Sequence, residues 1–393
     1  MNLTTLEDLG DVSGKKVFVR VDFNVPLSGG EVADDLRLRA AVPTILDLLD
    51  AGAAVILASH LGRPRGKVDE ALRLSPVAAH LNDLLAREVR TVPDVVGPEA
   101  RSACSGMSPG DVVLLENLRF EPGEEKNDPA FAQALADLAD LYVDDAFGAA
   151  HRAHASVVGV PELLPHAGGR LLVREVAVLS NLLEDPDRPY VAIIGGAKVS
   201  DKLGTISSLS ARVDRLLIGG AMAFTLIAAE GGSVGDSLCE PDRFEEVREA
   251  LRLISERGVE VILPVDVIAA QDVDEEAEAS VVPAAEIPEG MKGLDIGPAS
   301  VSRFAAALGD ARTILWNGPM GVFEIPAFAE GTKGIAEAIG GSHAFSVVGG
   351  GDSLRAVREL NLEDSFGHLS TGGGASLEFL EGRVLPGIEA LET

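Results

Sequence analysis

Residues 190–198 read YVAIIGGAK, an apolar run of mostly β-branched side chains followed at once by two glycines. The pattern recurs at 215–222 (RLLIGGAM), 313–319 (TILWNGP) and 344–353 (AFSVVGGGDS). Short apolar runs that end in glycine turns and alternate with Ala- and Leu-rich helical stretches are typical of parallel strands joined by crossover helices. The sequence therefore predicts an α/β fold.

Working outward from these runs, similar ones occur in both halves of the chain. The predicted strands are Val17–Val21, Ala53–Ala58, Val112–Leu115, Leu141–Val143, Tyr190–Ile194, Arg215–Ile218, Val259–Leu263, Thr313–Trp316 and Ala344–Val348. At about 150 residues per domain, 393 residues favour two or three domains. A predicted helix from Arg170 to about Leu183, closed by the DPDRP run at 185–189, marks the boundary between them.

Composition excludes several classes of partner. The chain carries 62 Asp and Glu against 33 Lys and Arg, so its net charge of -29 repels nucleic acid and an anionic membrane surface. The two cysteines, Cys104 and Cys239, form no CxxC motif, and the longest uncharged apolar stretch, 216–229, is too short to span a bilayer. We therefore expect a cytoplasmic protein that binds neither nucleic acid nor membrane.

The strand ends of the first half are polar and rich in arginine. Because side chains alternate along a strand, Arg20, Asp22 and Asn24 can line one side of a strand end, unless Arg20 simply pairs with Asp22 in the sheet. Guanidinium groups match phosphate and carboxylate oxygens, so arginines that converge with histidines would hold a small, multiply charged anion. The alternative is that they are solvated or salt-bridged on loops. The further candidates are Arg37, Arg63, Arg119, Arg152, His60 and His151.

The strand ends of the second half are glycine turns. A glycine turn that opens a helix presents backbone N–H groups and the positive end of the helix dipole to a phosphate. In the GGGDS run at 349–353, Asp352 would then be a magnesium ligand, or else Asp and Ser simply cap a helix. Lys198 and Lys202 lie four apart at the start of a predicted helix, where they would meet phosphates or remain solvated.

Two motif searches narrow the class of enzyme. No GxxxxGK[ST] and no well-placed GxGxxG occurs, which disfavours a P-loop enzyme and a dinucleotide-dependent dehydrogenase. The run STGGGAS at 370–376 is consistent with a second phosphate nest or with a flexible hinge, and the residues leave both readings open.

Taken together, eight ordered motifs resemble the phosphoglycerate kinase family from end to end. They are RVDFNVP at 20–26, SHLGRP at 59–64, ENLRF at 116–120, DAFGAAHRAHAS at 145–156, GGAKVSDK at 195–202, WNGPMGVFE at 316–324, GGGDS at 349–353 and STGGGAS at 370–376.

The resemblance implies two doubly wound parallel-sheet domains in a bilobal molecule, joined by an interdomain helix and a hinge. It implies residues 1–170 as a phosphoglycerate-binding domain, 171–379 as a nucleotide-binding domain, and a tail of about 380–393 that packs back on the first. The implied reaction moves a phosphoryl group reversibly between 1,3-bisphosphoglycerate and ADP, yielding 3-phosphoglycerate and ATP with Mg²⁺, in a monomer. A non-catalytic nucleotide- or anion-binding protein on the same fold is the alternative.

The motifs also imply roles for individual residues. Those implied for phosphoglycerate are Arg20, Asp22, Phe23, Asn24, Arg37, His60, Leu61, Gly62, Arg63, Arg119, His151 and Arg152. Those implied for the nucleotide are Gly196, Ala197, Lys198, Lys202, Gly219, Gly220, Gly293, Asn317, Pro319, Glu324, Gly350, Gly351, Asp352 and Ser353, with Asp352 on the metal. Arg37, Lys198, Gly350 and Gly351 would surround the transferring phosphoryl group.

Three positions depart from the family pattern. Ala149 stands where Thr is usual, Ala221 replaces a third glycine, and Lys292 stands where Trp is frequent. The first two are small residues, so we expect altered contacts rather than lost activity, and Lys292 affects the packing of the adenine. If the substrates bind different domains, the domains must close around them, with hinges at Arg170–Leu183 and Ser370–Gly374.

Overall fold

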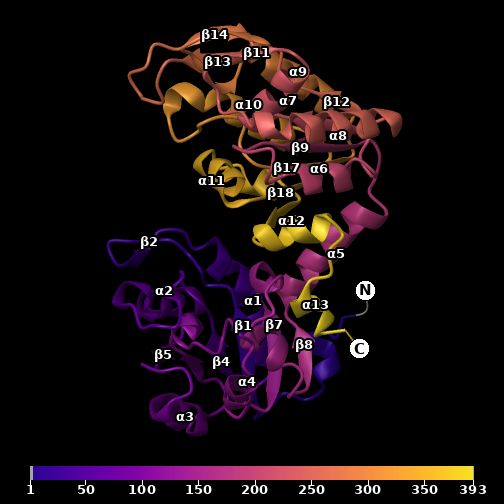
Figure 1. Cartoon of the computed structure of the whole chain (residues 1–393). Helices are drawn as coiled ribbons and strands as arrows, with labels where there is room; N and C mark the ends of the chain where they lie inside the picture. The colour runs from indigo at the N-terminus through magenta and orange to yellow at the C-terminus, as the bar shows by residue number, and fades with distance from the viewer. Residues whose placement is uncertain (1–2, 393) are drawn as a thin grey trace. The chain divides into compact units, whose positions relative to one another are not determined.

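The computed structural model describes residues 3–392, which divide into two compact units (Figure 1). Unit 1 comprises the described residues up to Ala177 and those from Arg383 onward, and unit 2 is Val178–Gly382. Each unit is built on a parallel six-stranded sheet with helices, so the predicted α/β class is confirmed.

The sheet of unit 1 has the order β5-β6-β4-β1-β7-β8, and every neighbouring pair is parallel. Its strands are β1 (Lys16–Val21), β4 (Ala54–Ala58), β5 (Val89–Thr91), β6 (Val112–Leu114), β7 (Leu141–Asp145) and β8 (His166–Gly168). A short antiparallel hairpin, β2 (Leu27–Ser28) with β3 (Glu31–Val32), follows β1. The central strands are buried on both faces, which explains their continuous apolar sequence.

Helices accompany the sheet of unit 1, and the first two of them share one apolar core with it. They are α1 (Leu36–Asp50), α2 (Ser75–Leu85), α3 (Pro98–Ser105), α4 (Pro129–Ala136) and α13 (Pro386–Glu389). In α1, Leu38, Ile45 and Leu49 recur at helical spacing and join one core with Val17 and Val55 of the sheet. The polar C-terminal ends of β1, β4, β6 and β7 are thereby left at one edge of the sheet.

The main sheet of unit 2 has the order β12-β10-β9-β17-β18-β19 and is also parallel. Its strands are β9 (Tyr190–Ile194), β10 (Arg215–Ile218), β12 (Glu260–Ile262), β17 (Thr313–Asn317), β18 (Phe345–Gly349) and β19 (His368–Ser370). All nine predicted strands are therefore present in the two sheets, each with its ends within two residues of the prediction.

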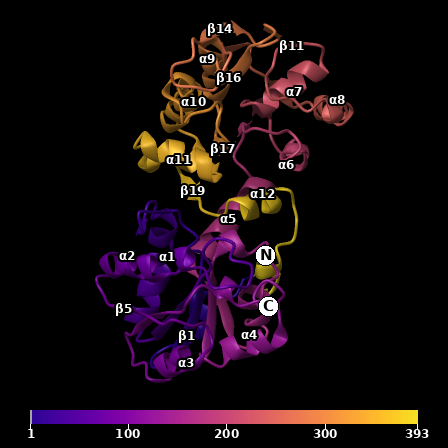
Figure 2. The ribbon, with the colours of Figure 1, turned by 60° about the vertical axis from the view of Figure 1, so that its left-hand side comes forward.

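Helices lie on both sides of the unit 2 sheet, with α6, α7 and α8 on one side and α9, α10 and α11 on the other (Figure 2). Their bounds are α6 (Leu203–Leu209), α7 (Met222–Ala229), α8 (Phe244–Glu256), α9 (Pro298–Leu308), α10 (Glu330–Gly340) and α11 (Gly351–Glu359), followed by α12 (Gly374–Leu380).

A second, antiparallel sheet in unit 2 was not predicted. It has the order β14-β13-β16, and a two-stranded pair, β11 with β15, lies beside it. The bounds are β11 (Ser233–Val234), β13 (Asp266–Ala270), β14 (Ser280–Pro283), β15 (Glu286–Ile287) and β16 (Lys292–Ile296). The segment between β13 and β14 contains the acidic run at 272–278. These charged residues interrupt the apolar pattern from which two paired strands could be predicted.

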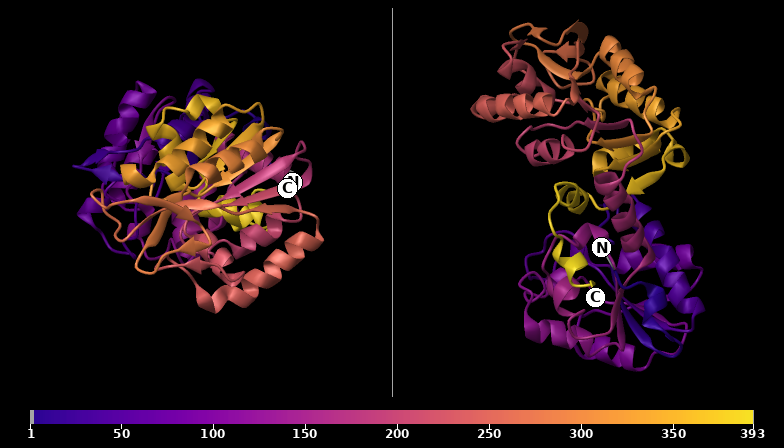
Figure 3. Two further views of the ribbon diagram at one scale, coloured as in Figure 1. Left: turned by 90° about the horizontal axis from the view of Figure 1, so that it is seen from above. Right: turned by 90° about the vertical axis from the view of Figure 1, so that its right-hand side faces the viewer.

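The predicted helix between the halves is confirmed as α5 (Arg170–Glu184). The two ends of the chain lie side by side in unit 1, where Leu3 bridges Glu392 and Thr5 bridges Gly168 (Figure 3). Among residues 3–392, no helix combines the length and the apolar character that a membrane span requires.

Candidate functional site

In unit 1, Arg20 near the end of β1 is a fully buried guanidinium held from three directions. Its Nε donates to Ser156 Oγ at 2.8 Å, one Nη donates to the carbonyl of Val21, and the other contacts His60 Nδ1 at 3.1 Å. Ser156 comes from a single π-turn, Ala155–Gly159, that follows β7. Arg20 is therefore an ordered, water-excluded cation at the polar edge of the sheet.

Asp22 pairs with Arg37 rather than with Arg20, so the alternative of a self-contained Arg20–Asp22 pair is wrong. The Asp22 carboxylate lies 3.2 Å from Arg37 Nη1, which also donates to the carbonyl of Asn24 at 2.8 Å. Arg37 sits in the first turn of α1 and is partly exposed, so its guanidinium is oriented without being withdrawn from solvent. The two arginines thus contribute separate positive charges to this edge.

His60 is the second residue after β4 and is buried beside Arg20. Burial lowers the pKa of His60 well below its usual 6.5, and the charges of Arg20, Arg119 and Arg37 lower it further. Because a guanidinium has only donors, His60 Nδ1 must accept the contact from Arg20, which leaves the ring proton on Nε2. His60 is thus a neutral hydrogen-bond donor in a cationic site.

The loop after β4 is tied to the loop after β6. Arg119 Nη1 donates to the Gly62 carbonyl at 2.8 Å, and the amide of Gly62 donates to Asn24 Oδ1 at 2.9 Å. Buried Asn117 exchanges hydrogen bonds with both backbone groups of Leu61, at 3.2 and 2.7 Å. These contacts bring the strand-end residues of the first motifs together. The Phe23 side chain is fully buried in the core, and only its backbone reaches this edge.

The other predicted residues lie at the margin of this cluster. Arg152 is exposed. The pKa of His154 is lowered to about 3 by burial, and then by the charges of Arg119, Arg20, Arg152 and His151. Arg63 is exposed and lies next to Gly62 in the loop after β4. Residue-level reasoning missed Ser156 and Glu124, two buried polar groups behind Arg20, because neither follows a predicted strand.

In unit 2, the glycine turns after β9, β10 and β17 pack backbone against backbone. A Cβ on Gly195 would lie 2.2 Å from the carbonyl of Pro319, and one on Gly220 would lie 2.6 Å from the backbone of Gly196. Gly219 is equally restricted, since a Cβ there would meet Met320 Sδ at 2.4 Å. Only glycine allows these three turns to meet at one point.

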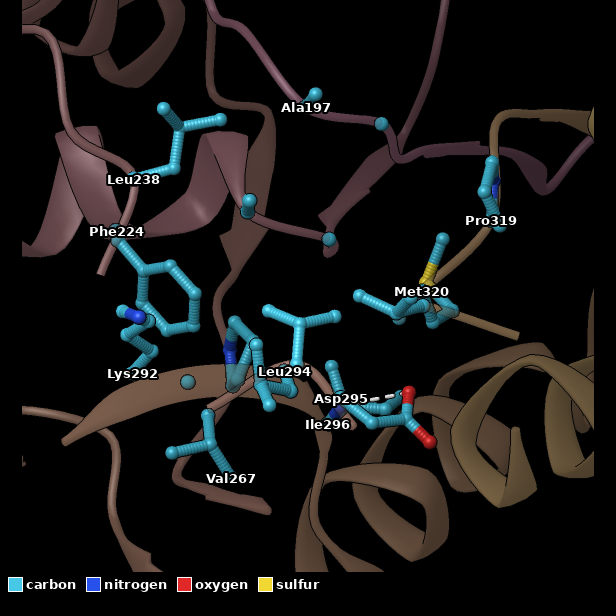
Figure 4. A pocket seen from close by; sticks show the side chains of 18 of the residues that line it. Ala197, Phe224, Leu238, Val267, Lys292, Leu294, Asp295, Ile296, Pro319 and Met320 are labelled. Atoms are coloured by element: carbon cyan, nitrogen blue, oxygen red, sulfur yellow. Dashed lines mark hydrogen bonds between the residues drawn. The ribbon is translucent and has the colours of Figure 1, made fainter. Parts of the chain in front are cut away.

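These turns form one wall of a cavity of about 360 Å³ (Figure 4). Phe224, Val267, Leu294 and Ile296 supply an apolar floor, and Pro319 and Met320 lie opposite Phe224. The predicted residues that line the cavity are Gly196, Ala197, Gly220, Gly293, Pro319, Glu324 and Asp352. An apolar cleft with a charged end suits a flat apolar ring attached to an anionic group.

Gly293 lies where the ring of Phe224 crosses β16. A Cβ there would lie 2.2 Å from Phe224 Cζ, and the Gly293 amide donates to Ser237 Oγ at 2.8 Å. Of the three departures from the family pattern, Ala221 and Lys292 both line this cavity. Ala149 is instead buried in unit 1 beside Ala146 and Val157.

At the charged end, α11 begins directly after β18. Gly350 takes a left-handed φ of 92° at the N-cap, and Asp352 is exposed in the first turn. The alternative of an Asp or Ser cap is wrong, because the cap is Gly350 and Ser353 Oγ instead accepts from the amide of Gly318 at 2.7 Å. The first amides of α11 therefore lack intrahelical partners and are available to an anion.

The two lysines are not the helical pair that their spacing predicts. Lys198 lies in the bend after β9 and is exposed, whereas Lys202 is the N-cap of α6. Lys202 Nζ donates to buried Asn317 at the end of β17. Burial lowers the pKa of Lys202, against the opposing effect of Asp201 and Asp352. The predicted helical pairing of the two lysines is wrong because α6 begins only at Leu203, after the glycine turn and after both lysines.

The side chains present can hold a magnesium ion only if a bound phosphate compound supplies the other metal ligands. Among the described residues, no group of three or more metal-binding side chains occurs. Asp352 provides one exposed carboxylate beside the helix amides, and Mg²⁺ is commonly bound by one or two carboxylates together with phosphate oxygens.

The STGGGAS run contains a hydrogen bond between Ser370 Oγ and Ser376 Oγ at 2.7 Å.

Comparison with known proteins shows which sequences and solved structures this chain resembles. A sequence profile described as phosphoglycerate kinase matches residues 6–383. The chain is 55% identical over 387 residues to a phosphoglycerate kinase of Moorella thermoacetica, covering 98% of each chain, and 56% identical over 391 residues to one of Rubrobacter xylanophilus, covering 100% of this chain and 98% of that one. It is also similar to the solved phosphoglycerate kinase of Coxiella burnetii, with a TM-score of 0.88, 40% identity and 99% of both chains covered.

Proposed function

The chain belongs to the phosphoglycerate kinase family, and from this premise we propose which residues of each unit carry the phosphotransferase reaction. We propose that unit 1 holds phosphoglycerate and that unit 2 holds ATP or ADP with Mg²⁺. The reaction transfers a phosphoryl group between 1,3-bisphosphoglycerate and ADP to give 3-phosphoglycerate and ATP. We further propose a monomer that acts in the cytoplasm, as the family resemblance implies.

The concentration of guanidinium groups around His60 is the observation that carries this proposal. Arg20, Arg37 and Arg119 all act on the pKa of this one imidazole, in a chain whose net charge is -29. A multiply charged phosphoglycerate gains bidentate contacts from such a cluster, and the neutral His60 adds a donor at Nε2. Arg63, His151 and Arg152 complete the proposed site from its exposed margin.

The nucleotide is proposed to lie along the cavity of unit 2. Its base would occupy the apolar floor beside Phe224 and Gly293, and its phosphates would reach the amides of α11. Glu324 and Asn317 lie along the same path, with Lys202 already bonded to Asn317. Mg²⁺, when bound with the nucleotide, neutralises phosphate oxygens, and Asp352 is the carboxylate that would hold it.

The chemistry of this reaction requires charge stabilisation rather than proton transfer. In the ATP-consuming direction the acceptor is a carboxylate, which is already ionised at neutral pH, so no general base is needed. We propose that Arg37, Lys198 and the amides of Gly350 and Gly351 surround the transferring phosphoryl group. Fixed positive charges and amide dipoles stabilise the charge on its oxygens.

The test is a coupled assay with MgATP and 3-phosphoglycerate that follows acyl phosphate formation. We expect turnover in the wild type and a loss of about 100-fold or more in Arg37→Ala, because its guanidinium stabilises the transition state. Arg39→Ala is the matched control, since this arginine of the same helix is 63% exposed and pairs only with Asp35. Its turnover should stay within about twofold of the wild type, as is usual for an exposed pair.

Two outcomes would count against the assignment. Near-normal turnover in Arg37→Ala would remove this residue from the site. A folded wild type that binds ADP but produces no acyl phosphate would favour the alternative, a non-catalytic nucleotide-binding protein on the same fold.

A further inference from the structure

Behind the arginine cluster of unit 1 lies a buried carboxylate, Glu124, that does not reach the polar edge of the sheet. It is fully buried in the turn that follows Phe120. Its Oε1 accepts from Ser156 Oγ at 2.5 Å, and its Oε2 accepts from the Ser156 amide at 3.0 Å. A buried carboxylate is costly unless it is paired and hydrogen-bonded, so this arrangement needs a reason.

Ser156 connects this carboxylate to the site. Its hydroxyl has one proton, which it donates in the hydrogen bond to Glu124 Oε1. The remaining lone pairs of Ser156 Oγ therefore face Arg20 Nε, which donates at 2.8 Å. The Ser156 hydroxyl therefore donates to Glu124 and accepts from Arg20.

The series continues from Arg20 to His60. The second Nη of Arg20 contacts His60 Nδ1, so the position of the guanidinium determines which ring nitrogen of His60 carries the proton. Burial raises the pKa of Glu124, and the charge of Arg20, the hydrogen bonds from Ser156 and the charge of Arg119 oppose that rise. His154, whose Nδ1 lies 3.8 Å from Glu124 Oε1, is the other titratable group beside the carboxylate.

We propose that Glu124 is a positioning residue for the phosphoglycerate site, acting through Ser156 on Arg20 and His60. This inference rests on the proposed function of the arginine cluster. Glu124 orients the Ser156 hydroxyl, the hydroxyl holds Arg20 in one rotamer, and Arg20 fixes His60 as an Nε2–H donor. Glu124 itself does not touch the substrate.

Glu124→Gln is the primary test, because the amide keeps the volume but offers one acceptor where Ser156 presents two donors. We expect the affinity for 3-phosphoglycerate, measured by calorimetry, to fall about tenfold or more. The affinity for ADP, which binds unit 2, should stay within about twofold. Glu162→Gln, an exposed glutamate of the same unit, is the control and should change neither affinity.

A spectroscopic readout separates positioning from general stability. In wild type without ligand, the ¹⁵N signals of His60 should show an unprotonated Nδ1 and a protonated Nε2. In Glu124→Gln they should shift toward a mixture of tautomers, because Arg20 is no longer held. This arm needs no substrate, so it tests the series even if wild type fails to bind 3-phosphoglycerate, an outcome that would instead overturn the proposed function.

Ser156→Ala provides a second variant that retains the carboxylate. If both residues act in one series, Ser156→Ala should reproduce the selective loss, and the double variant should bind 3-phosphoglycerate no more weakly than the weaker single variant. Independent packing damage would make the two losses add. The proposal is overturned by additive losses, by equal losses for ADP and 3-phosphoglycerate, or by unchanged His60 signals in both variants.

Discussion

Gly220 shows how a single residue decides the shape of the cavity in unit 2. It adopts a φ of 65°, and its missing Cβ leaves room for the backbones of Gly196 and Pro319. Gly258 has a similar φ of 77° but lies in the open, with nothing within 4 Å of a Cβ. Comparing alanine substitutions at these two glycines therefore separates the cost of backbone strain from the cost of disrupted close packing.

We expect Gly258→Ala to lower the free energy of unfolding by about 1–2 kcal/mol, the cost of a left-handed alanine. Gly220→Ala should cost about 1–3 kcal/mol more, because the added methyl group forces backbone segments apart. It should also raise the KM for ATP. Urea unfolding and initial rates measure both effects, and equal stability of the two variants would contradict the close packing.

Asp295, at the floor of the same cavity, gives a prediction about pH. Burial raises the pKa of Asp295 to about 7, although its carboxylate accepts hydrogen bonds from the amides of Gly331 and Ile296. Between pH 4 and 7 the folded protein therefore holds a proton that the unfolded chain releases. Stability must fall as the pH rises through this window.

Replacing Asp295 by Asn should reduce this slope without abolishing it, because burial also raises the pKa of Asp144 to about 7 and of Asp145 to about 6 in unit 1. We expect the wild type to lose on the order of 2–4 kcal/mol relative to Asp295→Asn as the pH rises from 4 to 7. Chemical unfolding at several pH values measures it. Asp236→Asn, an exposed carboxylate of the same unit, should leave the slope unchanged. A slope in Asp295→Asn equal to that of the wild type would assign it to other carboxyl groups.

At the scale of elements, the start of α11 combines a strand end, a glycine turn and a helix dipole. Gly350 turns the chain so that the free amides of the helix and the Asp352 side chain lie together beside the cavity. A metal–phosphate complex at this point would meet both the helix amides and the carboxylate.

Asp352→Asn should therefore weaken MgADP binding about tenfold or more, while ADP without magnesium binds with nearly unchanged affinity. Calorimetry with and without Mg²⁺ measures the difference. Asp364→Asn, an exposed aspartate after the same helix, is the control. An equal loss with and without Mg²⁺ would show that Asp352 does not act through the metal.

The whole molecule consists of two units, each with its own sheet and its own proposed ligand. A phosphoryl group released into water would be lost to hydrolysis, so transfer requires the units to enclose both substrates. We expect the radius of gyration from solution scattering to decrease when ADP and 3-phosphoglycerate are both bound, and less with either alone. An unchanged radius with both ligands would contradict domain closure about α5 and the Ser370–Gly374 segment.

The fold class, the nine strands and the helix at 170–184 could be predicted from the sequence. These depend on local patterns, because a buried parallel strand must be apolar throughout and must turn where glycine permits. The same patterns placed the arginines and the glycine turns at strand ends. They failed for β5, β8 and β19, whose three residues include polar or small side chains, and for the antiparallel sheet beside the acidic run, where no long apolar segment exists.

Which polar groups meet one another depends on the folded arrangement of the loops. Arg20 and Asp22 share a strand face, yet each finds its partner elsewhere, in Ser156 and Arg37, residues 136 and 15 positions away in the sequence. Lys198 and Lys202 are spaced as a helical pair, yet the helix begins after both. Side-chain partners across a fold depend on loops whose paths no local periodicity encodes, and for that reason Glu124 became visible only behind the assembled site.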